Sequence, residues 1–258
     1  MKNKVSFLKS KFFKHNELIY GFFSRNGGIS SRPFNTLNCS KNTKDLNNNV
    51  KKNIKKSLYS LNAINKKLIV ANQYHSNKII IIKNKLKKNY RADGFVTNNK
   101  NIFLGILTAD CAPVFFYDPK IKIIGAAHIG WKGCLNDICK TAIKSMENVG
   151  SKKTNIESII GPCINFKHYE VGRDLYLKYY KKNKKYKKFF IKKDSNKYLF
   201  NLSYAIEYQL KKLGIKRVII CNEDTYSNKR KYFSHRRSIM KGESNTGRMI
   251  NIIGFLRK

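Results

Sequence analysis

Apolar residues in this chain gather in short runs that are separated by turns and polar stretches, and β-branched and aromatic residues are frequent in these runs. That pattern is typical of β-strands. We predict strands at residues 68–75, 78–83, 92–98, 103–109, 113–118, 122–128, 157–162 and 216–221. We expect 103–109 and 122–128 to be neighbouring strands, because the run between them closes on an Asp118-Pro119 turn.

Three other segments carry helical signals. Residues 47–62 form a very basic amphipathic pattern, and a helix is also indicated at 133–148. A third helix is predicted at 201–213, where Asn201 can cap the first turn and Gly214 can end the last one. The apolar positions of this third helix recur at helical spacing, at Leu202, Ile206, Leu210 and Leu213.

The order of these elements bears on the fold class. Strands in clusters with few helices between them favour an α+β fold of mixed sheets layered with helices over a doubly wound parallel sheet. No repeat and no Gly/Ser- or Pro-rich linker divides the chain, so we predict one compact domain over 1–258. Within it, 173–200 is expected to be a helix followed by an exposed excursion.

Composition supports a folded protein away from the membrane. Hydrophobic residues make up 41% of the 258 residues and aromatic residues 12%, which is typical of a globular chain. No run of about 18 uncharged apolar residues is present, and the first residues are too interrupted by Lys and His for a signal peptide. We therefore expect a cytoplasmic protein without a membrane partner.

The six cysteines contain no CxxC pair, and in a cytoplasmic chain of this length they are expected to be reduced. We interpret Cys39, Cys134, Cys139 and Cys221 as small buried hydrophobic residues. Cys111 is different, because it lies at the end of a predicted strand in the sequence LTADC.

The formal net charge of +39 comes mostly from lysines that are spread along the chain, as at 51–56 and 181–188. Phosphate-binding surfaces are more often local and rich in Arg, whose guanidinium binds phosphate bidentately. We therefore expect only non-specific, salt-sensitive contact with nucleic acid. A basic RNA-associated protein remains the non-enzymatic alternative.

Three side chains with metal-binding chemistry follow apolar runs: His75, Cys111 and His128. One Cys and two His ligands at loop positions can bind Zn²⁺ and leave a fourth position open, as catalytic zinc sites do. The same residues also permit a metal-free Cys–His dyad with Cys111 as nucleophile, or ordinary core and loop roles. Their separations match no local metal motif, so the residues alone leave these alternatives open.

The segment GWKG directly follows His128 and leads into a predicted helix. A glycine-rich turn at a helix N-terminus presents free backbone N–H groups to an anion. We therefore expect an anion to bind beside the three candidate ligands.

A series of short motifs resembles one protein family, the YfiH-type, laccase-domain purine nucleoside phosphorylases. The resemblance begins at GFFSRNGGISSRPFNTLNCS (21–40) and covers nearly the whole chain. The later motifs follow in family order: NQYHSN, ADGFVT, LTADCAPV, AAHIGWKG, IGPCI, HYEVG, YFSHRR and TGRM.

The resemblance implies a function and a set of metal ligands. His75, Cys111 and His128 stand at the positions of the family's zinc ligands, which form the floor of its active site. It also implies phosphorolysis of adenosine, inosine, guanosine and methylthioadenosine, together with adenosine deamination. The family has also been named multicopper polyphenol oxidase and given a role in peptidoglycan editing. A copper-dependent oxidase and a Cys–His hydrolase of a peptidoglycan precursor are therefore the alternatives.

The matching motifs supply candidate substrate contacts. Phosphorolysis needs an anion site beside the anomeric carbon and stabilisation of a cationic transition state. Four arginines are candidates for phosphate or ribose contacts, although each could equally tie loops together: Arg25, Arg236, Arg237 and Arg248. Gln73, Asp110 and Glu170 are polar candidates for orienting substrate, and Asp110 is also a candidate partner of a metal-bound histidine.

The chain departs from the family pattern at three places. Ser76 stands where the family has Gly, His235 stands where it has Tyr, and Lys167 and His168 replace two cysteines. None of these changes removes a zinc ligand. His235 and His168 could change the substrate preference or add a titrating group near the site.

Overall fold

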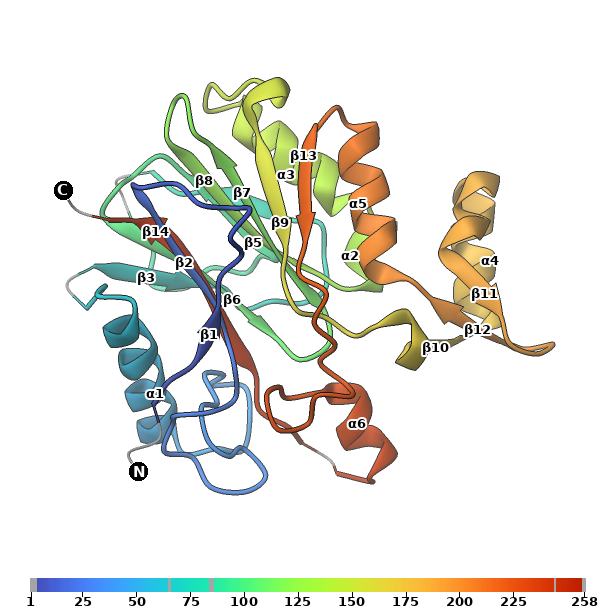
Figure 1. Ribbon diagram of the computed structural model, residues 1–258, viewed down its shortest axis with the longest axis horizontal. Helices are drawn as coiled ribbons and strands as arrows, with labels where there is room; N and C mark the ends of the chain where they lie inside the picture. The colour runs from blue at the N-terminus through green and yellow to red at the C-terminus, as the bar shows by residue number, and fades with distance from the viewer. Residues whose placement is uncertain (1–3, 65, 84–85, 244, 257–258) are drawn as a thin grey trace.

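The computed structural model describes residues 4–64, 66–83, 86–243 and 245–256. Two mixed β-sheets pack face to face, with helices on their outer sides (Figure 1). The five-stranded sheet has the order β1 (Phe7–Leu8), β2 (Leu18–Phe23), β14 (Met249–Phe255), β6 (Ile102–Thr108), β3 (Lys67–Val70). The six-stranded sheet has the order β13 (Arg217–Ile220), β9 (Glu157–Ile160), β7 (Ala112–Asp118), β8 (Ile123–Ile129), β5 (Gly94–Thr97), β4 (Ile79–Ile81).

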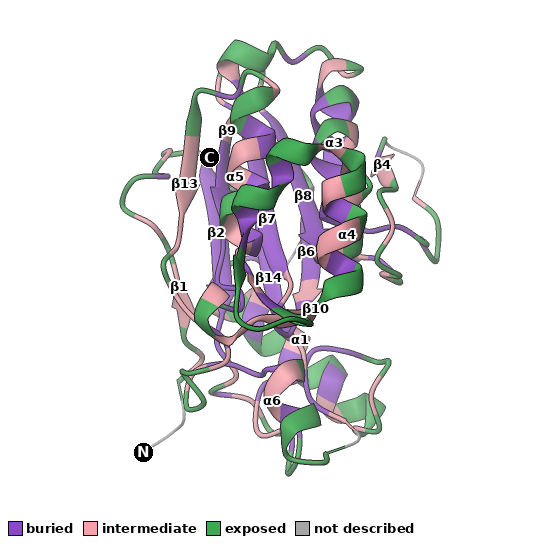
Figure 2. Cartoon of the chain, turned by 90° about the vertical axis from the view of Figure 1, so that its right-hand side faces the viewer, coloured by how far each residue is buried: buried purple, intermediate pink, exposed green. Residues whose placement is uncertain are grey.

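Alternation along β7 shows how the sequence builds these layers. Phe115 and Tyr117 point into the apolar layer between the two sheets, whereas Val114 and Phe116 point to the opposite face. Side chains two residues apart share one face of a strand, so a strand that is apolar throughout must be covered on both sides. Both faces of β7 are fully buried (Figure 2).

The helices supply that cover. Helix α3 (Ile138–Glu147) and helix α5 (Leu202–Lys212) pack on the outer face of the six-stranded sheet. Helix α1 (Asn47–Ser60) packs through Ile54 and Leu58 on the outer face of the five-stranded sheet. The predicted α+β class with mixed sheets is therefore confirmed.

The predicted helices are largely confirmed. Helix α1 covers the predicted segment 47–62 as far as Ser60, and helix α5 begins after Asn201, whose side chain accepts a hydrogen bond from the Tyr204 backbone N–H. The predicted helix 133–148 divides into α2 (Trp131–Leu135) and α3. The break falls at Asp137, which adopts a left-handed conformation with φ of 60°.

The prediction for 173–200 is confirmed in part, because the segment begins with a helix and residues 191–197 are exposed, but the exposed part is a β-hairpin tip and not a loop. Strand β10 (Glu170–Gly172) precedes α4 (Arg173–Lys182) and the 3₁₀ helix η3 (Lys184–Phe189), and two strands follow them. Together they form a three-stranded antiparallel sheet in the order β10, β12 (Lys197–Phe200), β11 (Phe190–Lys192). Aromatic residues from α4, η3 and β12 are buried in the core, namely Tyr179, Tyr186, Phe189 and Phe200. Aromatic packing, which the many lysines obscured, sets this segment in place.

Two further expectations need correction. Strands β6 and β8 are not neighbours in one sheet, because β6 pairs with β14 and β3 while β8 pairs with β7 and β5 in the facing sheet. The run 68–75 forms a strand only as far as Val70. Strands β2 and β14 lie in segments where we predicted no strand, and β14 pairs with both β2 and β6.

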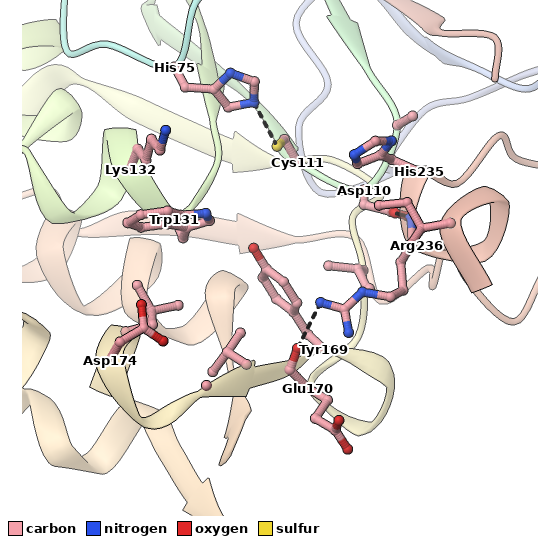
Figure 3. A pocket seen from close by; sticks show the side chains of 16 residues that line it. His75, Asp110, Cys111, Trp131, Lys132, Tyr169, Glu170, Asp174, His235 and Arg236 are labelled. Atoms are coloured by element: carbon pink, nitrogen blue, oxygen red, sulfur yellow. Dashed lines mark hydrogen bonds between the residues drawn. The ribbon is translucent and has the colours of Figure 1, made fainter. Parts of the chain in front are cut away.

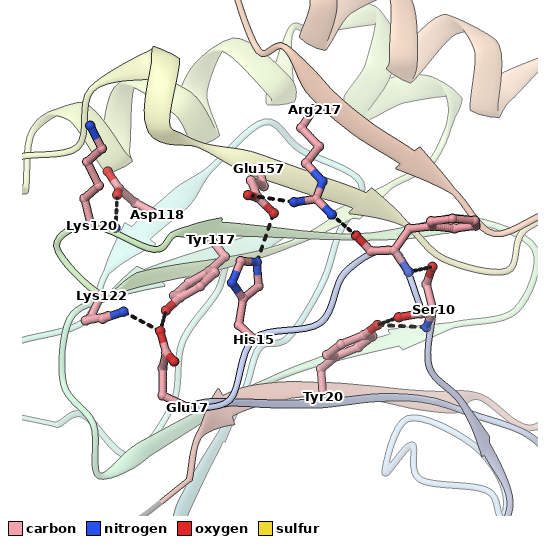
Figure 4. A network of polar contacts seen from close by, with 11 residues as sticks. Ser10, His15, Glu17, Tyr20, Tyr117, Asp118, Lys120, Lys122, Glu157 and Arg217 are labelled. Carbon is pink, nitrogen blue, oxygen red and sulfur yellow. Dashed lines mark hydrogen bonds and ion pairs between the residues drawn. The ribbon is translucent and has the colours of Figure 1, made fainter.

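A polar network connects the N-terminal segment to the six-stranded sheet (Figure 4). His15 Nε2 lies 3.0 Å from Glu157 Oε2, and Glu157 also pairs with Arg217 at 3.1 Å. Glu17 accepts hydrogen bonds from Tyr117 and Lys122. These contacts hold the residues that directly precede β2 in place.

The remaining elements are short: η1 (Lys153–Asn155), η2 (Phe166–His168) and α6 (His235–Met240). Among the residues described, no helix has the length and apolarity that crossing a lipid bilayer requires. Cys39, Cys134 and Cys139 are buried as predicted, whereas Cys221 is only half-buried.

Candidate metal centre and substrate chambers

The three candidate ligands meet at one place. Cys111 lies in the short crossing from β6 to β7, His128 lies near the end of β8, and His75 lies in the loop after β3. One ligand atom from each lies within 4.8 Å of the others. Cys111 Sγ is 3.9 Å from His75 Nε2 (Figure 3). The convergence comes from two different sheets, which explains why no local spacing motif is present.

Asp93 holds this centre together, and the sequence reasoning did not assign it a role. Its Oδ1 accepts hydrogen bonds from His128 Nδ1 at 2.8 Å and from the His75 backbone N–H at 3.0 Å. Its Oδ2 accepts from the Ser76 backbone N–H and hydroxyl, each at 2.7 Å. The only signal in the sequence was its place in the motif ADGFVT.

These contacts explain the loop that replaces the second half of the predicted strand 68–75. The backbone around His75 wraps the Asp93 carboxylate instead of continuing a ladder, and His75 itself has φ of 62°. Asp93 thus holds a proton on Nδ1 of His128, and Nε2 is the nitrogen that can bind a metal.

Gly130 permits the close approach of the backbone to the centre. A Cβ atom at this position would lie 2.8 Å from Cys111 Sγ and 3.3 Å from His75 Cδ2. Any side chain at residue 130 would therefore occupy space that the candidate ligands need.

Electrostatics favour a thiolate at Cys111. Burial opposes the charge, but the facing His128 and hydrogen bonds from His128 and His75 lower the pKa of Cys111 from 9.0 to about 6. Burial likewise opposes protonation of His128, yet Cys111 and Asp93 raise its pKa to about 9. By contrast, burial raises the pKa of Cys39 to about 12.

The donor set fits a divalent metal of zinc type. Zn–S and Zn–N bonds of about 2.3 and 2.0 Å at a tetrahedral angle bring sulfur and nitrogen to about 3.5 Å apart. The 3.9 Å between Cys111 Sγ and His75 Nε2 is close to this separation. His75 is exposed and Cys111 half-buried, so a fourth position can face solvent or substrate. Within the described part of the chain, this is the one such group of three His, Cys, Asp or Glu side chains.

A chamber of about 500 Å³ opens on one side of the centre (Figure 3). Trp131 and Tyr169 supply aromatic walls, and Arg236 lies over the Tyr169 ring at 5.6 Å. Three carboxylate residues line it as well: Asp110, Glu170 and Asp174.

A second, smaller chamber of about 250 Å³ shares His75, Ala109, Cys111 and His235 with the first. Its other polar lining comes from Ser40, Asn42, Gln73, His128 and Arg248. No carboxylate residue lines it among those the structure describes.

The four candidate arginines separate into two pairs. Arg236 and Arg248 line the chambers. Arg25 lines neither of them, because its guanidinium binds the Asn35 carbonyl at 2.8 Å and stacks 4.4 Å over Phe233. Arg237 donates to backbone carbonyls, including that of Thr225 at 2.9 Å. The alternative of loop-tying roles therefore describes Arg25 and Arg237.

The polar candidates also have definite partners. Gln73 lines the smaller chamber, but its amide pairs with both backbone groups of Leu107 at 2.8 Å and extends the sheet edge. Asp110 accepts from Thr225, Ser234 and the Arg236 backbone, so the role of metal-ligand partner falls to Asp93.

Glu170 lies at the rim of the larger chamber and pairs with Lys193 at 2.6 Å and Lys197 at 3.2 Å. These contacts, led by the hydrogen bond from Lys193, lower the pKa of Glu170. Its charge is therefore already balanced by two lysines.

The departures from the family pattern fall in different places. His235 lines both chambers, and burial together with nearby Arg248 lowers its pKa. His168 instead faces Asp224 at 2.7 Å and stacks on Tyr226, away from both chamber linings. The Gly-Trp-Lys-Gly turn forms the start of the five-residue helix α2, and the anion site expected there stays a prediction.

The fold and the site define an α+β protein with two large packed sheets and a Cys–His centre between two chambers. The family model described as multi-copper polyphenol oxidoreductase laccase matches residues 19–256. The chain therefore belongs to this family, and the resemblance to YfiH-type, laccase-domain proteins is confirmed.

Relatives support the same assignment. A purine nucleoside phosphorylase of Rickettsia conorii is 38% identical over 66% of this chain and 71% of its own length. One of Haemophilus influenzae is 30% identical over 90% of this chain and 92% of its own length. The solved structure of the hypothetical protein YfiH of Bacillus licheniformis has a TM-score of 0.86 and 29% identity, with 93% of each chain covered.

Proposed function

We propose that this protein is a zinc-dependent purine nucleoside phosphorylase, a glycosyltransferase. Its substrates are adenosine, inosine, guanosine or methylthioadenosine, together with inorganic phosphate, and its products are the free base and a ribose 1-phosphate. Adenosine deamination is a second proposed reaction at the same site. We place both activities in the cytoplasm, as the sequence predicts.

One observation carries the proposal: His75, Cys111 and His128 converge within 4.8 Å at the junction of two chambers. A catalytic site for two substrates needs separate volumes that meet at the reacting atoms. The names of relatives from Rickettsia and Haemophilus, purine nucleoside phosphorylases, agree with such a site.

His75, Cys111 and His128 would hold the zinc ion, with Asp93 orienting His128. The bound ion would supply Lewis acidity at the floor of the chambers.

The side chains of the chambers would position the two substrates. In phosphorolysis a phosphate oxygen forms a bond to the anomeric carbon, and the bond from that carbon to the base nitrogen breaks. The electron pair of the broken bond stays on the base, and the proton of hydrogen phosphate ends there as well. Trp131 and Tyr169 provide flat apolar surfaces for the base, while the Asp110 carboxylate can stabilise positive charge on the ribose.

The test is a paired measurement on protein purified in low-metal buffer. We expect one zinc per chain and phosphate-dependent release of base from inosine or adenosine, both lost in Cys111→Ala. Cys221→Ala is the matched control, because this half-buried thiol lies outside both chambers. Inosine formation from adenosine without phosphate would support the deaminase activity. Base release that survives Cys111→Ala would contradict the proposal.

The centre favours one second candidate, a Cys–His hydrolase that acts on a peptidoglycan precursor. Its supporting observation is the pKa of Cys111, lowered to about 6 beside two imidazoles. A metal-free enzyme that loses turnover when iodoacetamide alkylates Cys111 at neutral pH would favour this candidate. Retention of activity only in the zinc-loaded protein would argue against it.

Copper chemistry of the multicopper type has less support from the donor set. Such centres need many histidines. The chain has five, and His15 and His168 each pair with a carboxylate outside the centre. His235 reaches the chambers but lies outside the group of three ligands.

A further inference from the structure

We propose that the two chambers are separate subsites, the smaller for phosphate against Arg248 and the larger for the purine nucleoside against Trp131. This inference rests on the proposed phosphorylase function and assigns its two substrates to the two chambers. The shared wall of His75, Cys111 and His235 then lies where phosphate and the anomeric carbon meet.

Arg248 has the properties of an anion-binding group. Its Nη1 donates to the Thr246 carbonyl at 2.7 Å and the Gly247 carbonyl at 3.1 Å, which anchors the guanidinium. Among the described residues it forms no ion pair with a carboxylate. Its opposing charges, Cys111 and Asp110, act on it without forming an ion pair, so a half-buried guanidinium here gains from binding an anion directly. Arginine binds phosphate with charge-assisted hydrogen bonds.

The linings of the two chambers differ in charge. The smaller chamber adds the hydroxyl of Ser40 and the amide of Asn42 to Arg248, and no carboxylate faces it within the described chain. The larger chamber mixes both signs, because the cationic Lys132 and Arg236 line it with three carboxylate residues. Glu170 is already balanced by two lysines, but Asp110 and Asp174 would oppose a phosphate dianion.

Arg236 is the competing candidate for phosphate. Its Nη2 donates to the Glu170 carbonyl at 2.7 Å, and its backbone N–H donates to Asp110 at 2.7 Å. The guanidinium is therefore anchored to a backbone carbonyl and lies over the Tyr169 ring in the wall of the larger chamber. This setting favours a role in the wall of the nucleoside subsite.

The size and the aromatic lining of the larger chamber favour it as the nucleoside subsite. A base with its ribose needs the chamber of about 500 Å³, whereas phosphate fits the chamber of about 250 Å³. Stacking of a base on an aromatic ring contributes about 1–3 kcal/mol in nucleic-acid complexes. The ammonium groups of Lys132 and Lys178 lie 5.5 and 5.6 Å from the Trp131 ring, and both side chains are exposed, so a base can displace one of them.

Because Trp131 is the only tryptophan of the chain, its fluorescence reports on the larger chamber alone. The experiment uses the full-length zinc-loaded protein at about 0.15 M salt, which screens non-specific binding to a chain of +39 charge. Inorganic phosphate binding is measured by calorimetry, and inosine binding is measured by quenching of Trp131. Neither measurement requires turnover.

We expect one phosphate per chain, with an affinity that falls about tenfold or more in Arg248→Gln. Inosine quenching should keep its wild-type affinity in that variant. Arg248→Lys keeps the positive charge but loses the forked guanidinium, so its phosphate affinity should lie between those of the wild type and Arg248→Gln. Arg230→Gln is the matched control, because it removes one exposed charge outside both chambers.

Phosphate affinity that drops in Arg236→Gln and not in Arg248→Gln would overturn the assignment. So would phosphate-dependent turnover in Arg248→Gln with an unchanged KM for phosphate, a result that leaves the phosphorylase function intact. Absence of both inosine quenching and turnover in the wild type would overturn the proposed function itself. Arg248→Lys keeps the test decisive if Arg248→Gln proves unstable by circular dichroism.

Discussion

Replacement of Asp93 by Asn tests whether this carboxylate organises the metal centre. Asp93 has no exposed surface. Its Oδ1 faces the Nδ1–H of His128 and the N–H of His75, and its Oδ2 faces the N–H and hydroxyl of Ser76. Every neighbour is a donor, so the NH₂ group of Asn would face a donor whichever way the amide turns.

The magnitude follows from these contacts. At least two hydrogen bonds to a charged acceptor are lost, each worth about 1.5–3 kcal/mol, so the free energy of unfolding should fall by roughly 3–6 kcal/mol. Loss of the carboxylate behind a metal-bound histidine typically weakens metal binding by about ten- to a hundredfold. We therefore expect Asp93→Asn to show both effects together.

Two assays measure this outcome. Zinc affinity is determined by competition with a chromophoric chelator, and stability is determined by urea unfolding of the metal-stripped protein. Asp118→Asn is the matched control, because Asp118 is equally buried and its Oδ1 accepts two backbone N–H groups. Its Oδ2 has no hydrogen-bond partner among the described residues, so an NH₂ group can replace it.

Wild-type zinc affinity in Asp93→Asn would refute the positioning role. Acid provides a second check. Burial opposes ionisation of Asp93, but the hydrogen bonds from His128 and Ser76 lower its pKa from 3.8 to about 2. A lowered folded-state pKa stabilises the protein above about pH 4, and this stabilisation, roughly 2 kcal/mol, is lost as the pH falls through about 2. The stability difference between wild type and Asp93→Asn should shrink over that range.

Two further substitutions separate site from scaffold. Gly130→Ala places a Cβ 2.8 Å from Cys111 Sγ, so zinc affinity should fall by about tenfold or more. The far-ultraviolet circular dichroism should stay unchanged. Wild-type zinc affinity would show that residue 130 does not crowd the ligands. Arg25→Met removes the hydrogen bond to Asn35 and the stacking on Phe233, so stability should fall by about 2 kcal/mol with an unchanged KM for phosphate. A raised KM at full stability would instead place Arg25 in the phosphate subsite.

Local sequence patterns were sufficient to predict several helices and strands. Helix α5 has its cap at Asn201, its apolar spacing and its end at Gly214 written within fourteen consecutive residues. The apolar run that forms β7 likewise predicted a strand. The identity of the candidate ligands came from family motifs, because residues from three distant segments carry no spacing signal.

Only the tertiary structure decided which strands face each other and what surrounds the ligands. The crossing at Cys111 between the two sheets, the pairing of β14 with β2 and β6, and the burial of the aromatic residues within 173–200 all depend on contacts between distant segments. Asp93 acts through donors in the 74–76 loop and at His128, and Arg248 has no carboxylate partner among the described residues because of where the chain places it. A side chain's chemistry is given by the sequence, but its partners and its exposure to water are properties of the folded chain.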